Sequence, residues 1–173
     1  MSIDTLKDRI PDYAKDLRIN LGIIASSTAL TPQQAWGTAV AAAVTARSPD
    51  VLAAISADAA AHLSPEALAA AKGAAAIMGM NNVYYRFTHF MGHEAEYASM
   101  PARLRMQIIG KPGVDHADFE LWCLASSAIT GCEQCVRSHE KVVREKGGTK
   151  EAIQDAVRIA SVVHAVALTL ATA

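Results

Sequence analysis

Residues 115–139 read DHADFELWCLASSAITGCEQCVRSH, and this stretch decides the fold class. Apolar residues recur at helical spacing until Gly131 marks a stop, and a second helical pattern begins directly at Cys132. The stretch predicts two helices, over 116–129 and 132–146. Because the connection between them is so short, they must pack closely against each other.

Helix signals continue along the rest of the chain. Thr31-Pro32-Gln33-Gln34 and Ser64-Pro65-Glu66 each place a capping hydroxyl before a proline at the first helical position. No alternating run of β-branched residues competes with helix. Further helices are predicted over 4–10, 12–24, 32–46, 50–60, 65–79, 80–91, 94–99, 101–109 and 150–170, with Gly79 and Gly110 as stops. The predicted fold class is all-α.

Composition and charge exclude several function classes. Lys and Arg number 16 against 17 Asp and Glu, so the net charge of −1 provides no basic surface for a phosphate backbone, and nucleic acid is not expected as a partner. The apolar stretch 159–173 is shorter than a membrane span and predicts a buried C-terminal helix, so no membrane is expected. The N-terminus lacks a charged start followed by a hydrophobic block, which favours a cytoplasmic protein.

Two segments of the chain are similar when shifted by 85 positions. Residues 64–71 read SPEALAAA and residues 149–156 read TKEAIQDA, with matching cap, acidic residue and apolar spacing. We therefore expect one helical domain, 1–173, with an internal duplication of about 31–91 and 116–173. Only the second half carries the cysteines, so a redox site is expected there alone.

The chain has three cysteines, and two of them are three positions apart. An odd number in a chain without a secretory signal argues against a structural disulfide framework. Cys132 and Cys135, one helical turn apart, should have Cα atoms about 5 to 6 Å apart, within reach of a disulfide. The start of a helix also favours thiolate over thiol. Cys123, in an apolar stretch, is predicted to be a buried packing residue.

An imidazole and a carboxylate accompany the dithiol. His139 follows Cys135 by four positions and Cys132 by seven, so the three share one helical face. Glu120 lies on the preceding helix and is placed to orient His139 or accept its proton. The set Glu-x11-Cys-x2-Cys-x3-His therefore predicts a thiol-based catalytic site.

Alternatives to a redox dithiol stay open. A Cys-x2-Cys pair also binds metals, but zinc needs further ligands, and His89 with His93 and Glu94 lacks an assured third ligand. Haem attachment needs a histidine where Val136 stands. Two other groups have more than one interpretation. His164 is interpreted as a core or subunit-interface histidine, and the polar residues within 81–86 as a buried hydrogen-bond network or the entrance to the dithiol.

Three segments carry a resemblance to a known family. They are residues 1–16, the segment Met78-Gly-Met-Asn-Asn-Val-Tyr-Tyr-Arg86, and the motif from Glu120 to His139. Over essentially its full length the chain resembles the alkyl hydroperoxidase D (AhpD) family of the carboxymuconolactone decarboxylase-like superfamily. The resemblance implies an all-α bundle of two similar halves, assembly as a homotrimer, and an alkyl hydroperoxide reductase, or thiol peroxidase, in antioxidant defence.

The resemblance also implies a role for each site residue. Cys135 corresponds to a buried peroxidatic cysteine activated through Glu120 and His139, and Cys132 to a more accessible thiol that resolves the sulfenic acid to a disulfide. No cofactor is bound. The reductant is the lipoyl group of a dihydrolipoamide acyltransferase, and an alternative function is a disulfide reductase adaptor that passes electrons to the peroxiredoxin AhpC.

One residue departs from the family pattern. Members often have histidine between the cysteines, where this chain has Gln134, a side chain that does not titrate near neutral pH. We therefore expect slower peroxide turnover with dithiol exchange preserved. A lactone decarboxylase of the same superfamily is disfavoured because that chemistry needs no paired thiols.

Overall fold

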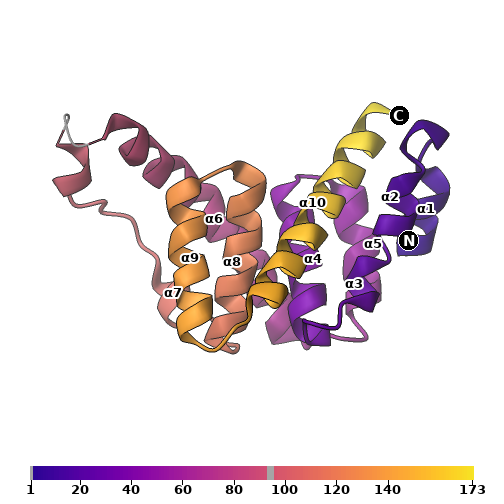
Figure 1. Cartoon of the computed structure of the whole chain (residues 1–173), viewed down its shortest axis with the longest axis horizontal. Helices are drawn as coiled ribbons and strands as arrows, with labels where there is room; N and C mark the ends of the chain where they lie inside the picture. The colour runs from indigo at the N-terminus through magenta and orange to yellow at the C-terminus, as the bar shows by residue number, and fades with distance from the viewer. Residues whose placement is uncertain (1, 93–95) are drawn as a thin grey trace.

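The computed structural model describes residues 2–92 and 96–173, which form helices and turns and no strand, so the all-α prediction is confirmed (Figure 1). In chain order the elements are α1 (Ile3–Arg9), η1 (Asp12–Ala14), α2 (Asp16–Asn20), α3 (Ile23–Ser26), α4 (Pro32–Thr45), α5 (Pro49–Ala59), α6 (Pro65–Met91), η2 (Tyr97–Ser99), α7 (Gln107–Gly110), α8 (His116–Thr130), α9 (Glu133–Glu145) and α10 (Lys150–Thr172). The predicted helix caps are confirmed: Thr31 forms a capping box with Gln34, and the Ser64 hydroxyl accepts a hydrogen bond from the backbone N–H of Ala67.

The core is built around α4, which packs against α5, α6, α8 and α10. Small residues over 39–43 of this helix are fully buried, so neighbouring backbones approach closely. The closest approach is at Gly37, where a Cβ would overlap the Trp122 indole of α8. The indole Nε1 of Trp122 also donates to the Gln34 carbonyl at 3.2 Å. α8, which carries Glu120, is thereby fixed to the centre of the molecule.

Substitution at Gly37 is expected to test this packing. Gly37→Ala should lower the free energy of unfolding by about 2 kcal/mol, because the added methyl overlaps a buried ring that cannot move aside. Gly79→Ala is the matched control in a helix interior: nothing lies within 4 Å of its Cβ position, so the change should raise stability by about 0.5 to 1 kcal/mol. Thermal unfolding of both variants measures the effect, and equal shifts would contradict the packing account.

The prediction that Gly79 ends a helix is wrong. α6 continues without interruption from Pro65 to Met91, so the helices predicted over 65–79 and 80–91 are one element. A glycine is tolerated here because residues on both sides of it, Met78 and Asn82, are anchored in the core. The continuity of α6 matters for the site because residues after Gly79, Asn82 and Arg86, bind the end of α8, while Met78 before it contacts His139 of α9.

Other predicted boundaries also change. In place of the helix predicted over 101–109, only Gln107–Gly110 is helical, and Arg103 has a positive φ of 53°, which interrupts a helix. The helix predicted over 12–24 is divided into η1, α2 and α3. The helix predicted over 94–99 falls partly on residues 93–95, outside the described residues, and 97–99 form a 3-10 turn.

The helix order fits the repeat seen in the sequence. α4, α5 and α6 begin at residues 32, 49 and 65, and α8, α9 and α10 begin at residues 116, 133 and 150, an offset of 84 or 85. The internal duplication itself stays a prediction. The dithiol lies between α8 and α9, within the second segment.

α10 packs against α4 and α8. Within the described residues it is the one helix that is long and apolar enough, by length and composition alone, to cross a membrane. Of its apolar window 33% is buried, including Ile159, Val163 and Val166, so one face of α10 packs in the core and the prediction of a buried helix is confirmed only in part. A single helix of this kind is weak evidence for a membrane, and the expected absence of a membrane partner stays a prediction.

Candidate active site

The turn between α8 and α9 places the two sulfurs. Gly131 caps α8 with a φ of 70°, in the left-handed region that glycine favours, and the Cys132 amide donates to the Ser127 carbonyl at 3.2 Å. Cys132 is then the N-cap of α9, and Cys135 lies in its first turn. Their Cα atoms are 5.3 Å apart and the sulfurs are bonded as a disulfide, which confirms the predicted spacing.

A polar cluster from α6 fixes the end of α8 just before this turn. The Asn82 amide donates to Thr130 Oγ1 at 2.7 Å, and its oxygen accepts from Ser127 Oγ at 3.0 Å. Arg86 donates to the Thr130 carbonyl at 2.7 Å. These three bonds satisfy the polar groups at the end of α8, so the dithiol turn is held against α6.

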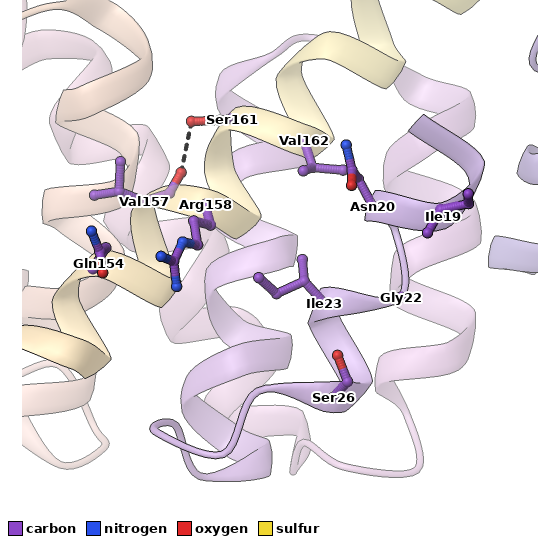
Figure 2. Close-up of a pocket in the computed structure, with 10 residues that line it drawn as sticks. All are labelled: Ile19, Asn20, Gly22, Ile23, Ser26, Gln154, Val157, Arg158, Ser161 and Val162. Carbon is purple, nitrogen blue, oxygen red and sulfur yellow. Dashed lines mark hydrogen bonds between the residues drawn. The ribbon is translucent and has the colours of Figure 1, made fainter. Parts of the chain in front are cut away.

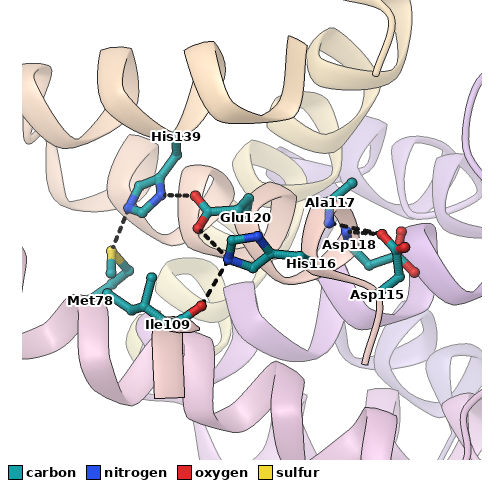
Figure 3. A network of polar contacts seen from close by, with 8 residues as sticks. All are labelled: Met78, Ile109, Asp115, His116, Ala117, Asp118, Glu120 and His139. Carbon is teal, nitrogen blue, oxygen red and sulfur yellow. Dashed lines mark hydrogen bonds and ion pairs between the residues drawn. The ribbon is translucent and has the colours of Figure 1, made fainter. Parts of the chain in front are cut away.

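Glu120 and His139 form the pair that the sequence predicted. His139 Nδ1 lies 2.6 Å from Glu120 Oε2, and both side chains are buried. A carboxylate can only accept, so Nδ1 carries the hydrogen and Nε2 of the neutral ring keeps its lone pair. His139 is thereby oriented as a base. Its Nε2 lies 3.1 Å from Met78 Sδ, a weak acceptor for the N–H that forms when the ring takes up a proton (Figure 3).

A cavity of about 410 Å³ connects the pair with the dithiol. Its lining residues come from α6, α7, α8, α9 and the segment before α7: Asn81, Tyr85, Met106, Ile109, Glu120, Gln134, Cys135, Ser138, His139 and Val142. The lining combines apolar side chains such as Ile109 and Val142 with the Cys135 sulfur, the His139 imidazole and the Glu120 carboxylate. Among the described residues, no group donates to the buried Oδ1 of Asn81, which also belongs to the lining. The cavity thus offers apolar surface for an organic group beside polar atoms for reaction.

The exposure of the two sulfurs differs from expectation. Cys132 was expected to be the more accessible thiol, but it is 0% exposed, whereas Cys135 is 5% exposed and lines the cavity. That expectation is wrong: Cys132, the N-cap of α9 directly after the Gly131 cap of α8, is enclosed at the junction of two packed helices, while Cys135 lines the cavity. Reagents entering the cavity therefore meet Cys135 first.

Cys123 is fully buried and not bonded to another cysteine, as predicted. Burial raises the pKa of its thiol well above the ordinary value, and the negative charge of nearby Glu120 raises this pKa further. Cys123 therefore stays a protonated thiol at neutral pH and is a poor nucleophile.

The residues within 81–86 divide between the two predicted roles. Asn82 and Arg86 form the structural bonds to α8, whereas Asn81 and Tyr85 line the cavity. His164 is exposed on the outward face of α10, so its interpretation as a core histidine is wrong, and the alternative of a subunit-interface histidine stays a prediction. His93 and Glu94 lie outside the described residues. In the rest of the chain no group of three or more His, Cys, Asp or Glu is arranged to hold a metal ion.

A second cavity, of about 660 Å³, lies between α10 and the segment α2–α3 (Figure 2). It is larger than the dithiol cavity, but its lining has no cysteine, histidine or carboxylate. Its one charged residue, Arg158, pairs with Asp155 at 2.7 Å. Ser161 is also occupied, since its hydroxyl donates to the Val157 carbonyl. This cavity lacks reactive groups, so the dithiol cavity is the candidate active site despite its smaller size.

His116 is a site residue that the sequence analysis missed. Its Nε2 lies 3.3 Å from Glu120 Oε1, on the carboxylate oxygen that His139 does not contact. The spacing of four positions from Glu120 on one helix was the available signal. The Ile109 carbonyl, 2.8 Å from the same nitrogen, comes from α7 and has no such signal in the sequence.

An all-α fold with a disulfide-forming Cys-x2-Cys at a helix start, beside a buried carboxylate–imidazole pair, is an arrangement typical of thiol oxidoreductases. The family model for the Carboxymuconolactone decarboxylase family matches residues 95–173. The chain is 61% identical over 170 residues to the alkyl hydroperoxide reductase AhpD of Gluconacetobacter diazotrophicus, covering 98% of this chain and 93% of that protein.

Two further relatives agree. The alkyl hydroperoxide reductase AhpD of Rhodospirillum centenum is 58% identical over 98% of this chain and 91% of its own length. That of a Bradyrhizobium species is 57% identical over 100% of this chain and 95% of its own length. The chain belongs to the AhpD family of alkyl hydroperoxide reductases, within the carboxymuconolactone decarboxylase group. The general function is that of an oxidoreductase acting on hydroperoxides.

Proposed function

We propose that the protein reduces organic hydroperoxides through a dithiol/disulfide cycle of Cys132 and Cys135, re-reduced by a lipoyl group of a partner protein. One observation carries the proposal: the Cys132–Cys135 disulfide lies beside a cavity that also exposes the hydrogen-bonded pair of His139 and Glu120. A dithiol, a base and a binding space for an organic group are therefore in one place.

The oxidative half-reaction begins at Cys135, the sulfur that faces the cavity. His139, oriented by Glu120, takes up the thiol proton, directly or through a water, and the helix start stabilises the thiolate. The thiolate attacks the terminal oxygen of the hydroperoxide. The S–O bond forms, the O–O bond breaks, and the alkoxide leaves as an alcohol with the proton held on His139.

The second step closes the disulfide. Cys135 is now a sulfenic acid, and Cys132 attacks its sulfur, so the S–S bond forms and hydroxide leaves as water with the Cys132 proton. The Cα separation of 5.3 Å allows this bond without a large backbone movement. In total one hydroperoxide gains two electrons, and two thiols become one disulfide.

The reductive half-reaction needs two electrons from outside the chain. A dihydrolipoyl group is a dithiol on a long, thin arm, and such an arm fits a cavity of about 410 Å³ better than a folded protein surface does. It would exchange with the disulfide and leave as the cyclic disulfide. We propose the lipoyl domain of a dihydrolipoamide acyltransferase as this partner, and a homotrimer as the assembly.

A coupled assay tests the proposed function. Purified protein, dihydrolipoamide dehydrogenase, lipoamide and NADH are mixed, and NADH loss is followed after addition of cumene hydroperoxide. We expect consumption that requires both lipoamide and the protein. If NADH loss is the same without the protein, the proposed function is wrong.

Gln134 is expected to limit the peroxide step. It is exposed at the cavity and cannot carry a proton at neutral pH. Gln134→His should raise the rate of oxidation by hydroperoxide by about threefold to tenfold, since a titratable donor for the leaving oxygen accelerates such steps. Stopped-flow oxidation of the reduced protein measures this. An unchanged rate would show that proton transfer at residue 134 is not limiting.

The same residue favours a second candidate function. A slow peroxide step with intact dithiol exchange suits an adaptor that passes electrons to a peroxiredoxin such as AhpC. Peroxide turnover is measured with and without that peroxiredoxin. A large increase that depends on Cys132 and Cys135 supports the adaptor, and no increase supports direct reduction alone.

A further inference from the structure

We propose that His116 is a positioning residue of the catalytic relay: it holds Glu120 so that one carboxylate oxygen faces His139, and it ties the cavity wall to that carboxylate. The inference rests on the proposed function, because it concerns how the same relay is held. Figure 3 shows His116 and His139 on opposite sides of Glu120.

The contacts of His116 fix where its hydrogen points. Its Nε2 lies 2.8 Å from the Ile109 carbonyl oxygen and 3.3 Å from Glu120 Oε1. A carbonyl oxygen can only accept, so Nε2 carries a hydrogen whether the ring is neutral or charged. This N–H is directed at the Ile109 carbonyl, and Glu120 Oε1 lies within ion-pair distance of the same nitrogen. A positively polarised N–H therefore lies near Glu120 Oε1 in either protonation state of His116.

The other oxygen of Glu120 has the complementary contact. Glu120 Oε2 accepts from His139 Nδ1 at 2.6 Å, while His116 holds Oε1. A carboxylate held at one oxygen still rotates about its terminal torsion, which has a broad energy minimum. Held at both oxygens, its plane is fixed, and with it the orientation of the His139 ring. Catalytic bases depend on this kind of orientation.

The electrostatic surroundings of Glu120 come from several elements. On α8 it lies near His116 and the Cys123 thiol, and on α9 near His139. Cys135 of α9 and Tyr85 of α6 line the same cavity as Glu120. α7 contributes the neutral Ile109 carbonyl. Of these groups, only the two imidazoles are within ion-pair distance of the carboxylate, at 3.3 and 2.6 Å.

His116 also connects the relay to the cavity wall. α7 has only four residues, and Ile109 and Met106 beside it line the dithiol cavity. The bond from His116 to the Ile109 carbonyl links this short element to the buried carboxylate. A substrate that packs against Ile109 therefore contacts an element whose position His116 fixes, and His116 also orients Glu120.

If His116 only stabilised the fold, its replacement would lower the unfolding temperature and the rate together. The His116 side chain is 36% exposed whereas the Glu120 side chain is 4% exposed, and Glu120 keeps its contact with His139 when His116 is replaced. A positioning role predicts that the rate falls while the unfolding temperature hardly changes. Two substitutions separate these roles, because His116→Leu removes the donor and His116→Gln keeps an N–H at a similar reach without a titrating ring.

The experiment combines these variants with Glu120→Gln. The rate constant for oxidation of the reduced full-length protein by cumene hydroperoxide, and the pH midpoint of Cys135 alkylation by iodoacetamide, are measured for each. We expect His116→Leu to slow oxidation by about tenfold and move the alkylation midpoint to higher pH. His116→Gln should stay within about twofold of the unmodified protein. In the Glu120→Gln background, His116→Leu should add no further loss.

The outcomes separate the inference from the proposed function. If Glu120→Gln oxidises as fast as the unmodified protein, the relay of the proposed function is wrong. If Glu120→Gln is slow but His116→Leu is not, or if the two losses multiply, only the role of His116 is overturned. Equal losses in His116→Leu and His116→Gln also overturn it. His89→Leu is the matched control, since His89 is an exposed histidine 3.7 Å from Glu133, and its rate should be unchanged.

Discussion

Replacing Cys135 by serine is expected to reduce the catalysed consumption of hydroperoxide at least a thousandfold, to the level without protein. Cys135 is the sulfur that lines the cavity, and a serine hydroxyl in its place has no accessible anion near neutral pH. No other described thiol can substitute, because Cys132 is fully buried and Cys123 is a buried, protonated thiol. The NADH-coupled assay with lipoamide measures the loss.

Cys132→Ser should behave differently from Cys135→Ser. It should react once with hydroperoxide, giving a sulfenic acid on Cys135 and a mass increase of one oxygen, and then fail to turn over. Cys123→Ser is the matched control, and its turnover should stay within about twofold, since a buried residue outside the cavity takes no part. Full turnover by Cys135→Ser, or a stable sulfenic acid on Cys132, would reverse the proposed order of the thiols.

His139→Gln is expected to slow the oxidation of the reduced protein by about a hundredfold or more, the usual contribution of a positioned general base. Glutamine keeps an N–H for the Glu120 carboxylate but has no lone-pair nitrogen to take up the Cys135 proton. Thiol reactivity should therefore move to higher pH, and raising the pH should restore part of the lost rate. Rates measured by stopped flow between pH 6 and about 9 show both effects.

Glu120→Gln tests the same pair from the other side. The neutral amide no longer stabilises the imidazolium that forms on His139, so a loss of similar size is expected, and the double substitution should be hardly slower than either single one. Additive losses would mean that the two residues act separately. A rate within threefold of the unmodified protein in both variants would remove the relay from the mechanism.

Local sequence signals predict those parts of the site that one helix or one turn determines. The spacing of Cys132 and Cys135, the stop at Gly131 and the helical phase of His139 all follow from residues within one turn. The position of Glu120 near His139 could also be predicted, because the short connection between α8 and α9 makes these helices pack against each other. The partners that these residues contact across the tertiary fold could not be predicted in this way.

The failures have a common physical cause. The contacts of His116 with Ile109 and of His139 with Met78 join segments that only the tertiary fold brings together. Likewise, Gly79 was predicted as a stop from its local preference, but burial of the residues around it in the core overrides that preference. The exposure of Cys132 depends on how the N-cap turns between two helices, which spacing alone does not determine.

Free-thiol titration in denaturant, before and after one equivalent of cumene hydroperoxide, tests the central claim most directly. The chain has three cysteines, so the reduced protein should show three thiols before and one after, with Cys123 remaining. Cys132→Ser should lose only one thiol, to a sulfenic acid. Retention of all three thiols in the unmodified protein, or loss of a single thiol from it, would contradict a cycle in which Cys132 and Cys135 are oxidised as a pair.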